Sequence, residues 1–207
     1  MARRNSPRSD NLRRLVAQEA ARLMSEQGID DFYLAKRKAA ERLGVSDQGS
    51  LPRNAEIETA LVERQRLFDA QTHLDRIRQY REAARNALLF FSIFSPRAAG
   101  AVLSGAVAAG SDLEIHLFAD TVERVTLKLV DNGVPYRLVD RRVRMSGDVH
   151  IRCPACRFLA DDVPVLAMLF PVDGVRQAPL CPVNGRPMRR ADLRELETLM
   201  RQDGNPA

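Results

Sequence analysis

The stretch Val102–Asp120, VLSGAVAAGSDLEIHLFAD, separates two different kinds of sequence. Before it the pattern is helical and rich in Arg, and after it short β-branched runs are broken by Gly, Pro and Asp. Within it, a strand-like run meets Ser104-Gly105, and a loop of small residues leads to a second strand-like run with Asp112 and Glu114. Because strand side chains alternate with a period of two, both carboxylates are expected on one face. Two adjacent carboxylates repel each other, so we expect water, a basic side chain or a cation between them. Mg2+ is a candidate because it takes oxygen ligands.

This order of strand, Ser-Gly turn, small loop and Asp-Leu-Glu-Ile resembles the core motif of the DNA polymerase β-like nucleotidyltransferase superfamily. Residues 96–200 as a whole are similar to small, divergent bacterial nucleotidyltransferase-like proteins. The resemblance implies that the backbone of Ser104 and Gly105 holds phosphate, and that Asp112 and Glu114 hold Mg2+ for in-line phosphoryl transfer. Such an enzyme would transfer a nucleoside monophosphate from an NTP to an acceptor that the sequence does not identify.

The chain departs from the superfamily motif in three ways. The turn reads Ser-Gly rather than Gly-Ser, the loop after it is short, and the expected third carboxylate is missing from the run VPVLAMLF at Val163–Phe170. Asp162, just before that run, is the nearest third metal-ligand candidate. An alternative therefore stays open: a catalytically degenerate nucleotidyltransferase fold that acts as a binding or regulatory module, with nucleic acid as one candidate partner.

Composition limits the class of protein. The chain has 207 residues and a net charge of +5, and all but three of its 32 basic residues are Arg. Arg binds phosphate in a bidentate manner, which favours a phosphate-bearing partner such as a nucleotide, although a high-GC genome gives the same bias. The longest apolar runs, Ala87–Phe94 and Val163–Val172, are too short to span a bilayer, so no membrane association is expected. A cytoplasmic location is expected, and the oligomeric state is not indicated.

The pattern along the chain predicts an α+β protein with a helical N-terminal region followed by a mixed β-sheet nucleotidyltransferase-like domain. We expect a basic disordered tail at 1–10, a helical region at 11–95 and the α+β domain at 96–207. Apolar periodicity and Gly or Pro stops predict helices at about 10–27, 31–43, 54–70, 72–94, 121–133 and 191–202. Strands are predicted at about 98–104, 112–118, 135–145, 149–159 and 163–170.

The helical region also has some likeness to a helix-turn-helix. The loop at 44–53 is longer than that motif requires, and the helix after it begins with Glu56 and Glu58. A helical bundle is therefore favoured over a DNA-binding helix pair.

Three further groups of residues are candidate sites. His150, Cys153, Cys156 and Cys181 include a Cys-x-x-Cys with zinc spacing, but the pair is expected on a strand, so buried thiols are favoured over a zinc site. Arg176 and Arg186, with Arg189 and Arg190, lie in a Pro-rich loop that either clamps phosphate or covers the sheet with its guanidinium groups in water. His116 shares the strand face of the acid pair and would orient a phosphate if the acids bind metal.

Overall fold

The computed structural model describes residues 7–29, 31–45, 51–68 and 70–203, which divide into two compact units. The first unit contains the chain up to His73 together with Pro182–Asn184, and the second contains Leu74–Cys181 and the chain from Gly185 onward. The predicted α+β class, with a helical N-terminal region before a mixed sheet, is confirmed. Among the described residues, no helix is both long enough and apolar enough to cross a membrane.

Three helices form the first unit: α1 (Pro7–Gln27), α2 (Phe32–Arg42) and α3 (Asn54–Phe68). The backbone after α1 and after α2 turns at a glycine with positive φ, which is 62° at Gly28 and 63° at Gly44. The Asp31 carboxylate caps α2 by accepting the backbone N–H groups of the second and third residues after it. The core of this unit is made of small and aliphatic side chains: Val16, Ala20, Leu23, Ala35, Ala39, Ile57 and Leu61.

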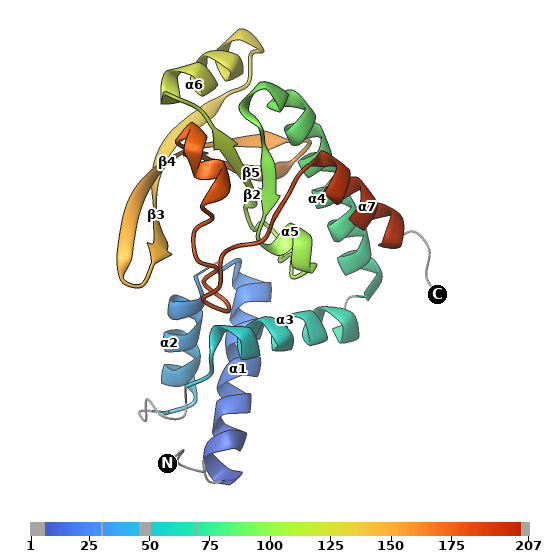
Figure 1. Cartoon of the computed structure of the whole chain (residues 1–207). Coiled ribbons are helices and arrows are strands. Elements are labelled where there is room, and N and C mark those ends of the chain that lie inside the picture. Colours follow the sequence, from blue (N-terminus) through green and yellow to red (C-terminus); the bar gives the residue numbers. More distant parts are fainter. Residues whose placement is uncertain (1–6, 30, 46–50, 69, 204–207) are drawn as a thin grey trace. The chain divides into compact units, whose positions relative to one another are not determined.

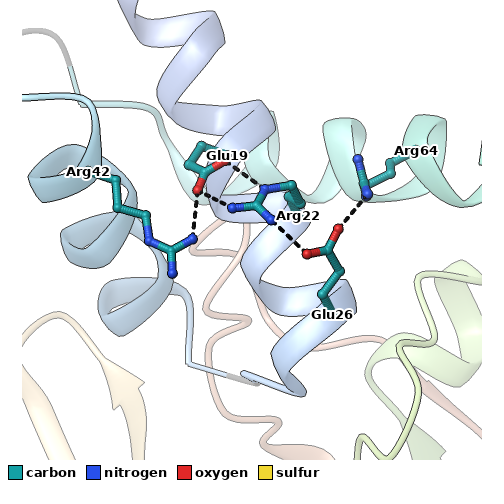
Figure 2. Close-up of polar contacts among 5 residues, drawn as sticks. All are labelled: Glu19, Arg22, Glu26, Arg42 and Arg64. Carbon is teal, nitrogen blue, oxygen red and sulfur yellow. Dashed lines mark hydrogen bonds and ion pairs between the residues drawn. The ribbon is translucent and has the colours of Figure 1, made fainter.

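A chain of ion pairs joins these three helices (Figure 2). Glu19 on α1 accepts Nε and Nη2 of Arg22 at 2.8 Å each, and Nη1 of Arg42 on α2 at 3.1 Å. Arg22 Nη1 also donates to Glu26 at 2.7 Å, and Arg64 on α3 donates to the other Glu26 oxygen at 2.7 Å. The hydrogen bonds from Arg22 lower the pKa of Glu19 from 4.5 to about 2, against the opposing effect of burial.

A six-stranded sheet organises the second unit (Figure 1). Its strands are β1 (Arg97–Ala99), β2 (Leu113–Phe118), β3 (Tyr136–Ser146), β4 (Val149–Ala160), β5 (Val163–Phe170) and β6 (Arg190–Ala191), in the spatial order β3-β4-β5-β2-β1-β6. β2 and β5 pair in parallel, with Glu114 opposite Leu166, and the other pairs are antiparallel. β5 lies between two neighbours and is buried on both faces, which explains its unbroken apolar sequence.

One face of the sheet is covered by α4 (Ala70–Phe90), α6 (Val122–Asp131) and α7 (Leu193–Asp203). The large core on this face joins helix residues to the odd-numbered residues of β2, and includes Leu88, Phe91, Val125, Leu129, Leu196, Leu113, Ile115 and Leu117. The predicted boundary between the two parts lay at 95/96, whereas the compact units divide at 73/74. The difference arises because most of α4 packs against the sheet.

The opposite face carries a smaller core: Phe118, Cys153, Ala155, Leu166, Met168 and Phe170. β4 pairs with β5 only from Ala155 to Ala160, so its residues before Ala155 pair with β3 alone. β3 and β4 therefore continue beyond β5 as a two-stranded ribbon (Figure 1). Three short helical segments complete the described part of this unit: η2 (Ser92–Phe94), α5 (Ala101–Ser104) and η3 (Val172–Arg176).

The predicted strand at 98–104 is wrong. β1 ends at Ala99, Gly100 turns the chain with φ 72° and ψ −144°, and α5 follows at once. A helical turn lets the consecutive residues Val102 and Leu103 both reach the core, which explains why the apolar run is not a longer strand. Gly105 ends α5 with φ 80°, so Ser104-Gly105 is the end of a helix and not a strand turn.

Two other predicted helix boundaries differ from those in the structure. α1 begins at Pro7, so Asp10 lies in its first turn rather than before it, and the predicted disordered tail overlaps the helix. Residues 1–6 of that tail lie outside the described part of the chain, as do residues 46–50 of the loop weighed for a helix-turn-helix. The predicted helix at 72–94 is divided into α4 and η2.

Candidate functional site

The acid pair of the central stretch lies at the start of β2. Glu114 is on β2 itself and Asp112 immediately precedes the strand. The Glu114 side chain is 25% exposed and that of Asp112 is 11% exposed, so both carboxylates are partly desolvated. A carboxylate in such a place needs hydrogen bonds or an opposite charge, and each of the two receives different partners.

Two arginines from the ribbon strands hold Asp112. Nη2 of Arg141 on β3 lies 3.3 Å from Asp112 Oδ2, and Nη2 of Arg157 on β4 forms a short ion pair with the same oxygen. The arginine side chains are 44% and 45% exposed, so water still reaches both guanidinium groups. Arg137 lies directly opposite Arg157 in the β3–β4 register and shares its sheet face. Arg137, Arg141 and Arg157 outnumber the one carboxylate of Asp112, so positive charge is in excess around it.

A second set of contacts holds Glu114. Its Oε1 lies 2.6 Å from Nε2 of the fully buried His116, and Nδ1 of that histidine lies 2.8 Å from Nε of Arg190 on β6. A guanidinium can only donate, so His116 accepts at Nδ1 and its Nε2–H donates to Glu114. His116 thus links Arg190 to the Glu114 carboxylate through two hydrogen bonds.

Arg190 is fixed by aromatic and backbone contacts. Its guanidinium carbon lies 5.0 Å from the ring centroids of both Phe118 and Phe170, and its Nη1 donates to the carbonyl of Gly174 at 2.9 Å. Burial lowers the pKa of Arg190 to about 10, and the nearby Glu114 carboxylate opposes that shift. This arginine belongs to the Pro-rich loop cluster and reaches the acid pair through His116.

The turn beside Glu114 is formed by Gly100, not by Ser104-Gly105. A Cβ added at Gly100 would lie 3.3 Å from Glu114 Oε2, because Ala99 on β1 is opposite Glu114. Ser104 is exposed at the end of α5, and Gly105 is buried. The structure therefore brings a glycine turn to Glu114, but it is a different glycine from the one that the sequence indicated.

The residues around the acid pair do not fit a two-metal Mg2+ site. One oxygen of Asp112 is engaged by two guanidiniums, and Glu114 is engaged by His116. The neighbouring strand offers Leu166 opposite Glu114, where a third carboxylate would be needed. Asp162 is exposed in the turn before β5, at φ 67°, and no group of three metal-binding side chains occurs among the described residues.

The remaining loop arginines lie apart from these contacts. Arg176 is at the end of η3, where it lines a depression of about 900 Å³ together with Cys153, Arg152, Phe170 and other residues beyond the ends of β2 and β5. Arg186 is exposed in the loop that follows, where its backbone carbonyl accepts the N–H of Cys181.

The four candidate zinc ligands are not brought together. Cys153 and Cys156 are three residues apart on β4, so their side chains point to opposite faces, one into each core. Burial raises the pKa of Cys153 to about 12 and that of Cys156 to about 11. His150 is exposed near the ribbon turn, with Nδ1 2.9 Å from the carbonyl oxygen of Asp148.

The sequence does not identify Arg141 and Arg157 as partners of the acid pair. Both fall within predicted strands, and the period of two would have placed them on a face. No sequence pattern indicates which carboxylate they meet, because they are 29 and 45 residues away from Asp112 in the chain.

No family model, no curated protein and no solved structure matches the chain.

Proposed function

We propose that the second unit is a nucleotidyltransferase-like fold that binds a phosphate-bearing ligand, a nucleotide, without a metal-dependent transfer reaction. The single observation that carries this proposal is the pair of arginines, Arg141 and Arg157, that converge on Asp112. In the superfamily that the sequence resembles, a carboxylate at this place would hold metal. Here it is ion-paired with two guanidinium groups and offsets only one of their two charges.

The arginine pair has the properties of an anion subsite. Two guanidiniums placed close together repel, and the Asp112 carboxylate keeps them in position before a ligand arrives. Each guanidinium has further N–H groups, and both side chains are nearly half exposed. Arg137, on the same face, adds a third positive charge. Phosphate oxygens form bidentate, charge-assisted bonds with arginine, so a triphosphate is a suitable ligand for this face.

The contacts of Glu114, the second acid of the pair, favour a structural role for this residue. Glu114, His116 and Arg190 form a continuous hydrogen-bonded series across β2 and β6. Removing any member would leave a buried polar partner unsatisfied, which supports a role in holding the sheet rather than in chemistry.

One observation favours an active nucleotidyltransferase as the competing function. The glycine turn at Gly100 approaches Glu114 closely, and such a turn is where the superfamily holds the phosphates of its substrate. This candidate requires that Mg2+ displace the arginines from Asp112.

Isothermal titration with ATP and with GTP, each with and without Mg2+, separates the two functions. The proposal predicts binding that does not require Mg2+ and that weakens at least about tenfold in Arg141→Gln/Arg157→Gln, because two charge-assisted hydrogen-bonding groups are lost. The control Arg124→Gln/Arg194→Gln removes the same charge from exposed helical positions of the same unit and should bind like the wild type.

Asp112→Asn gives different results for the two functions. If Asp112 only positions the arginines, its amide variant should still bind nucleotide without Mg2+, because the amide oxygen still accepts a hydrogen bond and the phosphates supply the counter-charge. If Asp112 holds a metal, Mg2+-dependent binding should be lost in Asp112→Asn and in Asp112→Ala/Glu114→Ala. Wild-type affinity in the Arg141→Gln/Arg157→Gln variant, or no nucleotide binding by the wild type, would refute the proposal.

A further inference from the structure

The outer half of the β3–β4 ribbon carries a second group of arginines on the opposite face from Asp112. The antiparallel register places Arg142 directly opposite Arg152, and Arg144 directly opposite His150. All four side chains are exposed. They alternate with Arg141 and Val143, so they form a separate patch, which we call the ribbon patch.

The ribbon patch is electrostatically costly to the isolated protein. Side chains directly opposite in an antiparallel pair have Cβ atoms about 5 Å apart, and like charges at such positions destabilise the sheet. Asp140 lies on the same face two residues before Arg142, but within the described part of the chain no carboxylate lies at ion-pair distance from Arg142, Arg144 or Arg152. On the other face, by contrast, Asp112 compensates Arg141. An external polyanion is the partner that would relieve this repulsion.

The outer end of the ribbon is held in place rather than free. The backbone N–H of Leu180 donates to the carbonyl of Arg144 at 2.6 Å. Gly185 leaves room for the same residue, because a Cβ there would lie 3.4 Å from Arg144 Nη2. The β3–β4 register shifts between Arg144 and Ser146, just before the turn. The patch therefore lies on a two-stranded element that the loop at Leu180 supports.

We propose that this ribbon binds duplex DNA by entering the major groove, with the ribbon patch on its phosphates and base edges. The major groove of B-DNA is about 12 Å wide and admits a two-stranded β-ribbon, and arginine is suited to both phosphate oxygens and guanine edges. The deep, narrow major groove of A-form RNA does not admit such an element. The inference goes beyond the nucleotide-binding proposal and uses different arginines on a different face, so either one can fail without the other.

Fluorescence anisotropy with a labelled 20-base-pair DNA duplex tests this proposal on the full chain. The variant is Arg142→Thr/Arg144→Thr/Arg152→Thr, since threonine suits exposed strand positions. The matched control, Arg124→Gln/Arg194→Gln/Arg201→Gln, loses the same charge from exposed positions on α6 and α7. Far-UV circular dichroism of each variant shows whether the fold is retained. Titrations at about 50 to 200 mM salt give the slope of log affinity against log salt concentration.

The wild type should bind with a salt-dependent affinity, and the ribbon variant should lose at least about tenfold in affinity. The magnitude of its salt slope should fall by up to about 2.7, because each lost phosphate contact contributes about 0.9. The control should keep the wild-type slope, and a duplex RNA of the same sequence should bind more weakly than DNA. Equal losses in both variants, equal binding of RNA and DNA, or no DNA binding by the wild type would each overturn the proposal.

Discussion

The ion-pair chain of the helical unit gives a prediction with a defined pH dependence. Glu19 is the residue to change, because it accepts three N–H groups, from Arg22 on its own helix and Arg42 on α2. Glu19→Gln keeps the shape of the side chain and one acceptor oxygen but removes the charge. We expect the variant to destabilise the packing of α1 on α2 and α3.

The size of the effect follows from the pKa of Glu19. The difference between the ordinary value of 4.5 and about 2 in the folded protein corresponds to about 3 kcal/mol of stabilisation at neutral pH. The Arg22 and Arg42 side chains are 35% and 47% exposed, so solvent screening reduces this to about 1–2 kcal/mol. The folded pKa is depressed, so this stabilisation is fully present above about pH 4.5 and is lost as the pH falls toward 2. At pH 3, about 40% of it should remain.

Urea unfolding followed by far-UV circular dichroism at pH 7 and at pH 3 measures the difference between wild type and variant. Hydrogen exchange of peptides from α1 and α2 at pH 7 assigns the loss to the first unit, since the two units need not unfold together. Glu63→Gln, at an exposed position on α3, is the control and should change stability by less than about 0.5 kcal/mol. An equal loss of folding stability in Glu19→Gln at pH 3 and at pH 7, or a loss no larger than that of Glu63→Gln, would contradict this assignment.

Two further predictions concern the second unit. Gly100→Ala should cost about 2–3 kcal/mol of folding stability, because φ 72° strains any L-residue and the new Cβ crowds Glu114 Oε2 at 3.3 Å. Gly110→Ala has the same φ with no atom within 4 Å of its Cβ, so an equal loss in a denaturation experiment would exclude the contact with Glu114 as a contributor. Because burial raises the pKa of Cys153 to about 12 and of Cys156 to about 11, a thiol reagent at pH 8 should modify only Cys181 in the native protein and all three cysteines after unfolding. Native labelling of Cys153 at the rate of Cys181 would contradict this.

Periodicity and stop signals predicted most elements because they depend on neighbouring residues. α2 begins after Asp31 and ends before Gly44, as local capping chemistry requires. An alternating run predicts β2, and a continuous apolar run predicts β5. The strand predicted from Ala98 failed because Gly100 adopts a backbone conformation that its neighbours do not specify. α4 has the apolar face of a bundle helix, and periodicity shows that a face is buried without showing against which element.

The sequence alone determined that the Asp112 and Glu114 side chains lie on the same face of the sheet. A period of two along β2 fixes the side-chain face, and this depends only on backbone geometry. The tertiary structure decided what the acids meet: Arg141, Arg157 and Arg190 come from three strands at separations of 29, 45 and 74 residues from Asp112 or His116. Strand order and register select those partners, and both result from the packing of the whole sheet. The same carboxylates could therefore be read as metal ligands from the sequence and yet lie against guanidinium and imidazole groups in the folded protein.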